Sequence, residues 1–321
     1  MNYAQSRVSK ALGTSLPLIQ APMSWVTSAR LVSAVSEAGG LGVLGPNAGQ
    51  SEMTSDPLET VARMRAEIRK AQTLTRKPVG LNVLLMQDSG GPLDDFTARW
   101  IAMAKEEGVR HFVSVGNASD QAFAALKADG GVIIHRPLTP TVANMRQAEA
   151  MGADVLVATG YDEGGWVPER ALGTFTVVPT MVDAVTAPVM ATGGINDRRG
   201  VKAAFALGAE GVFIGTRFIV TEESPAAQAV KARIVACGFD DMHVVSRRQR
   251  SISTRMADTL ATLHADPSNQ EDLDQKITQL GGLRPGMLAG DMDAGIISVN
   301  TGIDIITTAP SVRDLVADLM G

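Results

Sequence analysis

The sequence predicts an α/β fold, a (β/α)8 TIM barrel with a small inserted helical subdomain. Eight short runs rich in Val, Ile and Leu end in Gly or Pro, and amphipathic segments lie between them. Apolar runs without strict polar alternation are typical of strands that are buried on both faces of a parallel sheet. Repeated βα units imply right-handed crossovers, and eight units favour a closed barrel over the alternative, a doubly wound open sheet.

The predicted strands and helices alternate along the first two thirds of the chain. The strands are expected at residues 18–22, 41–45, 79–85, 112–116, 132–137, 155–160, 189–194 and 212–215. The helices are expected at residues 28–38, 57–72, 94–107, 120–127, 141–151, 175–185 and 198–207. The second helix follows Asp56, which can cap it, and begins with Pro57, which suits a first helical turn.

The last third of the chain has a different pattern. No convincing strand is predicted from Glu222 to about Leu280, and helix is expected there. A barrel of this type takes roughly 250 residues, so part of the chain is left over. We therefore expect residues 1–221 and 289–321 to form the barrel. Residues 222–288 are expected to form a helical substrate or lid subdomain, and a final helix near 311–320 returns to the barrel.

Composition excludes several classes of protein. The 321 residues include 29 Lys and Arg against 34 Asp and Glu, a net charge of −5, so the basic surface of a nucleic-acid or membrane binder is not expected. A single cysteine, Cys237, excludes an internal disulfide and a cysteine metal cluster, and the four histidines are too dispersed for a metal site. With no signal-like segment and no apolar run of ~18 residues, a cytoplasmic location is expected.

Two glycine-bearing turns mark the most informative positions. Active sites of such barrels lie at the carboxyl ends of the strands, and the loops after strands seven and eight commonly hold a phosphate. Gly193 and Gly194 follow the seventh predicted strand, and Gly215 and Thr216 follow the eighth. Glycine lets backbone N–H groups approach an anion, and a following helix start adds a favourable dipole. We predict a phosphate site here; the alternative is two tight turns without a ligand.

Six short motifs occur in order along the chain. They are QAPMSW at 20–25, AGGLG at 38–42, GLN at 80–82, EGG at 163–165, ATGGI at 191–195 and GTRF at 215–218. In this order they resemble the nitronate monooxygenase family of FMN flavoproteins, formerly called 2-nitropropane dioxygenases. The FMN-dependent enoyl-ACP reductase II enzymes belong to the same superfamily.

The resemblance implies FMN bound noncovalently at the barrel mouth, with its phosphate on the backbone of Gly193, Gly194, Gly215 and Thr216. It also implies flavin-ring contacts from Ala21, Pro22, Met23 and Asn82, and further contacts from Thr159, Gly164 and Gly165. Arg136 stands where some members carry Lys, and a cation there would stabilise reduced, anionic flavin. Two alternatives are that Arg136 only forms a salt bridge at the rim, or that the neighbouring His135 faces inward instead.

One departure from the family pattern concerns the chemistry. The family loop usually has the sequence EAGGH, whereas this chain has DEGGW at 162–166, so Trp166 replaces the family histidine. Indole N–H only donates and cannot act as a general base. Proton abstraction from a neutral nitroalkane is therefore not expected, and the catalytic residue stays unknown. Trp166 could stack on a ring or plug the site. Near the C-terminus, Asn300 and Thr301 replace a family Gly-Gln pair.

Three functions are compatible with these residues. The first is FMN-dependent oxidation of a small nitronate-like substrate with O2. The second is NAD(P)H-dependent reduction of enoyl thioesters or quinones through FMN, and the third is flavin binding with little turnover. A non-flavin barrel that binds a phosphorylated metabolite is a weaker fourth. The basic run at 247–250 is expected to be a solvated helix face, or to bind an acyl carrier protein or a nucleotide phosphate. A small-molecule substrate is expected, and a homodimer is left open.

Overall fold

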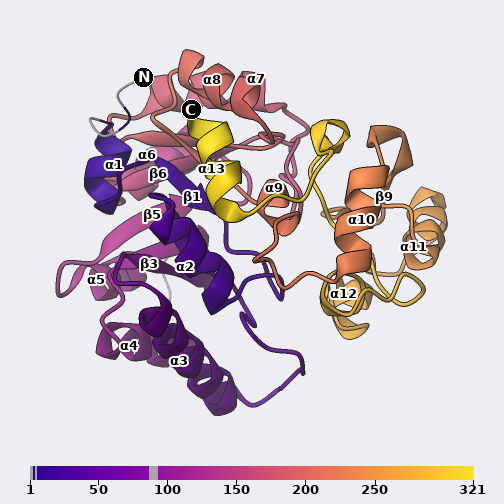
Figure 1. Cartoon of the computed structure of the whole chain (residues 1–321), viewed down its shortest axis with the longest axis horizontal. Coiled ribbons are helices and arrows are strands. Elements are labelled where there is room, and N and C mark those ends of the chain that lie inside the picture. Colours follow the sequence, from indigo (N-terminus) through magenta and orange to yellow (C-terminus); the bar gives the residue numbers. More distant parts are fainter. Residues whose placement is uncertain (1–2, 4–5, 87–92) are drawn as a thin grey trace.

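The computed structural model describes residue 3 and residues 6–86 and 93–321, and it confirms the predicted barrel. Eight parallel strands form a closed barrel in the order β1 to β8 (Figure 1). Their bounds are β1 Leu18–Gln20, β2 Leu41–Leu44, β3 Val79–Leu85, β4 His111–Gly116, β5 Val132–Arg136, β6 Val155–Thr159, β7 Val189–Thr192 and β8 Gly211–Ile214.

Helices connect the strands and cover the outside of the barrel. They are α2 Ala29–Glu37, α3 Pro57–Leu74, α4 Asp95–Glu106, α5 Asp120–Lys127, α6 Val142–Ala150, α7 Thr174–Ala184 and α8 Arg198–Ala206. As expected, Asp56 caps α3 through its side chain and Pro57 begins the helix. A short α9 (Thr216–Ile219) follows β8 directly, and α13 (Val312–Met320) returns to pack on α2 and α8.

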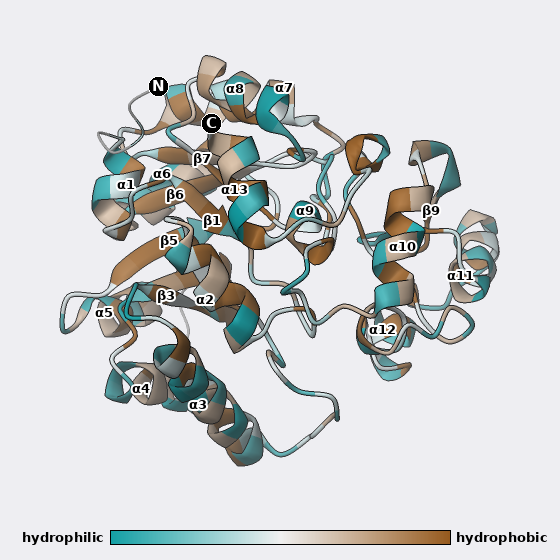
Figure 2. Ribbon diagram, in the orientation of Figure 1, coloured by the Kyte–Doolittle hydropathy of each residue, from teal (hydrophilic) through white to brown (hydrophobic). Residues whose placement is uncertain are grey.

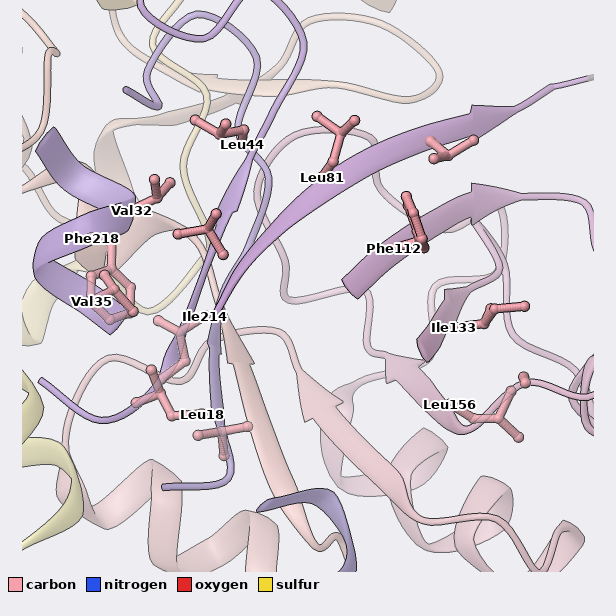
Figure 3. Packing of buried hydrophobic residues seen from close by; sticks show 14 of the residues in the cluster. Leu18, Val32, Val35, Leu44, Leu81, Phe112, Ile133, Leu156, Ile214 and Phe218 are labelled. Atoms are coloured by element: carbon pink, nitrogen blue, oxygen red, sulfur yellow. The ribbon is translucent and has the colours of Figure 1, made fainter. Parts of the chain in front are cut away.

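The strands separate two apolar layers because successive side chains point to opposite faces. On β4, Phe112 belongs to the large cluster between strands and helices, whereas Val113 belongs to the cluster inside the barrel. Figure 3 shows residues of the outer cluster, among them Phe112 and Leu156, and the strands are mostly apolar in Figure 2. Helix α1 (Arg7–Leu12), which was not predicted, contributes Val8 to the inner cluster.

The same alternation decides which β5 residue faces the barrel interior. Ile134 belongs to the inner cluster and Ile133 to the outer one. Arg136 therefore points inward, two residues beyond Ile134. His135 points outward, where its ring lies 5.4 Å from that of Phe123 on α5. The alternative with an inward His135 is thus wrong.

The segment after α9 lies beside the barrel (Figure 1). It contains α10 Gln228–Ala236, η2 Phe239–Asp241, β9 Met242–Val244, β10 Arg250–Ile252, α11 Arg255–Ala265, α12 Leu273–Gln279 and η3 Arg284–Leu288. Its apolar side chains form two clusters of their own, one of which also includes Val26 and Ile219. Within the described residues, no helix is long and apolar enough to cross a membrane.

Two expectations for this segment are wrong. Strands β9 and β10 pair as an antiparallel hairpin where no strand was expected, because each has only three residues, too few to show a period. The basic run is consequently not a solvated helix face. Arg247 and Arg248 lie in the hairpin turn and Arg250 lies in β10, where it is buried. Cys237 is buried.

Candidate functional site

A cavity of about 570 Å³ opens at the carboxyl ends of the strands. This volume is typical of a cofactor or drug-sized ligand site. Eleven of the twelve residues predicted to bind the cofactor line it: Ala21, Pro22, Met23, Asn82, Arg136, Gly164, Gly165, Gly193, Gly194, Gly215 and Thr216. Thr159 is the exception, because it is fully buried at the end of β6 and does not reach the cavity wall. The fold thus brings together residues from six separate parts of the chain.

The turns after β7 and β8 present backbone N–H groups at one corner of this cavity. Gly193 and Gly194 have φ values of 115° and 68°, in the left-handed region that favours glycine. Within the described part of the chain, the N–H groups of Gly194 and Gly215 donate to no acceptor. Buried or half-buried N–H groups are rarely left without a partner, so an anion at this corner would satisfy both.

Helix α8 contributes less to this corner than expected. Asp197 caps α8 with its own carboxylate, which accepts from the N–H groups of Arg199 and Gly200 at 2.9 and 3.1 Å. A carboxylate already occupies the helix start, so its dipole is not open to another anion there. Short α9 begins directly at Thr216. Anion binding at this corner therefore rests on the turn backbone rather than on a long helix.

A C-terminal segment, residues 298–302, joins the loops that follow β6, β7 and β8. The side-chain amides of Asn300 and Asn196 exchange two hydrogen bonds, at 2.8 and 2.9 Å. The Asn300 backbone N–H donates to Thr216 Oγ1 at 2.9 Å, and the Gly165 N–H donates to Ser298 Oγ at 2.9 Å. From the sequence, Asn300 was noted only as a departure from the family pattern. Asn196 and Ser298 were missed, because their hydrogen-bond partners lie about a hundred residues away in the chain.

Arg136 and Glu163 form a buried ion pair in the cavity wall. Arg136 Nη2 donates to Glu163 Oε1, and both side chains are about nine-tenths buried. Burial raises the pKa of Glu163 to about 7, although the neighbouring Arg136 and Arg250 lower it. The salt bridge expected for Arg136 is present, and Arg136 also lines the cavity; its role beside a flavin stays a prediction. The role of Glu163 was missed, although it belongs to a noted motif.

Trp166 lies at the other end of the same loop. It lines the cavity and is partly exposed, and the Arg248 guanidinium lies 5.2 Å from the centre of its ring. The backbone N–H of Val167 donates to the Arg248 carbonyl at 2.9 Å, so the β9–β10 hairpin is tied to the loop. Arg250 of β10 also ties the hairpin to this loop, because its Nη2 donates to the Tyr161 carbonyl at 2.7 Å.

Residues from the segment beside the barrel complete the wall. Ile277, Leu283 and Met287 from α12 and the following turn line the cavity together with Met23 and Leu84. They make this part of the wall apolar. The sequence predicted a substrate or lid role for this segment but no particular residue, because loop packing has no periodic signal. No group of His, Cys, Asp and Glu within the described residues could hold a metal ion.

The comparisons with known proteins agree with this geometry. The sequence model described as "Nitronate monooxygenase" matches residues 5–321. The chain belongs to the nitronate monooxygenase family. The family resemblance inferred from the six motifs is thereby confirmed, and the names of the family and its members identify an oxidoreductase. FMN is the typical cofactor of this family.

Named relatives act on more than one kind of substrate. A Rhodococcus jostii protein, "(3aS,4S,5R,7aS)-5-hydroxy-7a-methyl-1-oxo-octahydro-1H-indene-4-carboxyl-CoA dehydrogenase", is 31% identical over 94% of this chain and 76% of its own length. A Staphylococcus haemolyticus "Probable nitronate monooxygenase" is 30% identical over 80% of this chain and 81% of its own. The structure of FabK from Thermotoga maritima superposes with a TM-score of 0.84 at 28% identity, covering 98% of this chain and 95% of that one.

Proposed function

We propose that the protein is an FMN-dependent oxidoreductase that acts on the α,β-carbon bond of an acyl thioester. FMN is assigned to the cavity described above, whose residues suit its charge and shape. Gly193, Gly194, Gly215 and Thr216 would hold the phosphate through their backbone, and Ala21, Pro22 and Met23 would lie beside the ring system. When bound, FMN supplies hydride transfer.

Glu163 carries this proposal. Among the described residues that line the cavity, Glu163 and Arg136 are the ones with ionisable side chains. With a pKa of about 7, the Glu163 carboxyl can hold or release a proton near neutrality. Reduction of an enoyl thioester needs a proton at Cα, and dehydrogenation needs one removed from Cα. Glu163 can serve either direction, and the Arg136 guanidinium holds its carboxyl in place.

The apolar wall supports a carbon-rich substrate. Ile277, Leu283 and Met287 offer dispersion contacts to an acyl chain or ring, but no donors for the two oxygens of a nitronate. The name of the Rhodococcus relative, a carboxyl-CoA dehydrogenase, associates this family with the oxidation of an acyl-CoA. We assign residues 222–288 the role of a substrate-covering subdomain on the same grounds.

Oxidation of a preformed nitronate with O2 is the second candidate. The family match and the staphylococcal relatives favour it. Trp166 in place of the family histidine opposes the reaction of neutral nitroalkanes, because indole has no lone pair for the proton. A nitronate has already lost that proton, so this objection does not apply to it.

Anaerobic spectroscopy of the purified holoprotein tests the proposal. NADH or NADPH should bleach the flavin absorbance rapidly, and a short enoyl-CoA added next should restore it. Ethyl nitronate replaces the nucleotide in a parallel sample. Rapid bleaching by the nitronate, with no response to either nucleotide, would instead support the second candidate. If purified protein holds no flavin and takes up none, both candidates are wrong.

A further inference from the structure

A second cavity, of about 480 Å³, lies next to the first. The two cavities share three wall residues, Met86, Leu138 and Trp166. One extended ligand can therefore pass over this shared wall with a different part in each cavity. The second cavity, which we call the side cavity, lies at the ends of β4 and β5 and is not needed for any flavin contact described above.

The walls of the side cavity are chemically unlike those of the main cavity. Asn144 and Gln147 on α6 line it. The Asn144 amide caps α6, because its Oδ1 accepts from the Thr141 N–H and its Nδ2 donates to the Thr139 carbonyl, whereas the Gln147 amide is exposed. Thr139 also lines it; its Oγ1 accepts from the Glu169 N–H at 2.9 Å, which leaves the hydroxyl proton to donate. The Gln147 amide and the Thr139 hydroxyl can therefore hydrogen-bond to a ligand that itself carries amide groups.

Positive charge gathers at the mouth of this cavity. Arg248 lines the cavity and its Nη2 lies 3.0 Å from Glu169 Oε1. Arg247, whose side chain is 75% exposed, lies 3.7 Å from the same oxygen. Two guanidinium groups thus share one carboxylate, and a net positive charge is left for an anion. Guanidinium groups bind phosphate with strong, charge-assisted hydrogen bonds.

From the shared wall, the amides and the excess positive charge, we propose that the side cavity binds the phosphopantetheine arm of the thioester substrate. The acyl end would enter the main cavity past Trp166, the two pantetheine amides would lie along α6, and the phosphate would meet Arg247 and Arg248. This inference rests on the proposed thioester function. Coenzyme A and an acyl carrier protein both carry this arm.

Binding of the arm can be measured without turnover. Titration calorimetry of the flavin-loaded protein with 4′-phosphopantetheine and with pantetheine isolates the contribution of the phosphate. We expect the phosphate to tighten binding about tenfold in the wild type, as for one charge-assisted hydrogen-bonded contact. In Arg248→Gln the two compounds should bind equally. Arg255→Gln is the matched control, because Arg255 lies in the same subdomain and also pairs with one carboxylate, that of Asp293.

A second variant fills the side cavity. Gln147→Trp is placed on an exposed face of α6, so the fold and the flavin spectrum should be unchanged. The KM for an enoyl-CoA should rise about tenfold with kcat unchanged. The KM for the same acyl group on N-acetylcysteamine, which lacks the long arm, should not move. Comparing KM values for the CoA and carrier-protein thioesters then shows which source the wild type prefers.

Equal binding of phosphopantetheine and pantetheine by the wild type overturns the inference. A rise of KM for NADPH instead of the thioester in Gln147→Trp also overturns it, because the cavity then holds the nucleotide. Tighter phosphopantetheine binding together with no turnover of any thioester has a different meaning. In that case the side cavity is assigned correctly and the proposed reaction is wrong.

Discussion

The main cavity is built in two different ways at its two sides. At the ends of β7 and β8, the wall includes the glycine turns at 193–194 and 215, where two backbone N–H groups have no protein acceptor among the described residues. At the ends of β5 and β6, the wall consists of large side chains, among them Arg136, Glu163 and Trp166. The first side suits a constant group such as a phosphate. The second depends on particular side chains, so single substitutions there alter its charge and shape.

The largest effect, a loss of FMN affinity, should follow from a carboxylate placed in the glycine turn after β7. Gly194→Asp introduces negative charge against the proposed phosphate and strains a residue with φ of 68°. We expect FMN affinity to fall at least about 100-fold, measured by fluorescence of released flavin. Gly13→Asp is the control, because Gly13 has φ of 64° in open space on the far side of the barrel. Retention of FMN by Gly194→Asp would refute the phosphate assignment.

Breaking the Arg136–Glu163 ion pair tests the wall at the ends of β5 and β6. Arg136→Met leaves the Glu163 carboxyl buried without its cation, so the free energy of unfolding should fall by about 3–5 kcal/mol. The double variant Arg136→Met with Glu163→Gln should recover most of this loss, because no buried charge is left. Urea unfolding of the three proteins gives the values. An equal loss in single and double variants would show that packing, not charge, dominates.

The pH dependence of activity tests Glu163 directly. Burial raises the pKa of its carboxyl to about 7, so the group is protonated below that pH and ionised above it. Reduction of an enoyl thioester needs the protonated form, and kcat should fall about tenfold per pH unit above 7. Dehydrogenation of the saturated thioester should show the opposite slope. Glu163→Gln should lower kcat and remove the dependence; an unchanged profile would exclude Glu163 as the proton carrier.

The smallest effect should come from restoring the family histidine. Trp166→His supplies a base and removes the stacking partner of Arg248. We expect turnover of neutral nitroethane to rise about tenfold, below the full range of general base catalysis because the surrounding wall is unchanged. Oxygen consumption measures the rate, and Trp166→Phe is the control without a base. No gain over Trp166→Phe would argue against this placement of the loop.

The two sides also differ in how well the sequence predicted them. The glycine turns were found because a backbone conformation leaves a local signature. The contacts of Asn82 and Arg136 were assigned only through the family resemblance, and strand alternation alone left open whether Arg136 or His135 faces inward. Glu163 was not assigned a role, since its pKa depends on burial by distant segments. The β9–β10 hairpin was missed for a similar reason. Its short strands are held by partners such as the loop at 161–167 rather than by a local pattern.

The hydrogen bonds of residues 298–302 have a consequence for biosynthesis. Asn300 contacts Asn196 and Thr216, so both turns of the anion corner are complete only when this late segment has been added. A nascent chain that has already formed all eight strands would still lack the last part of the corner. Cofactor uptake is therefore expected to follow release from the ribosome, and a chain shortened before residue 298 should stay colourless even if its barrel forms.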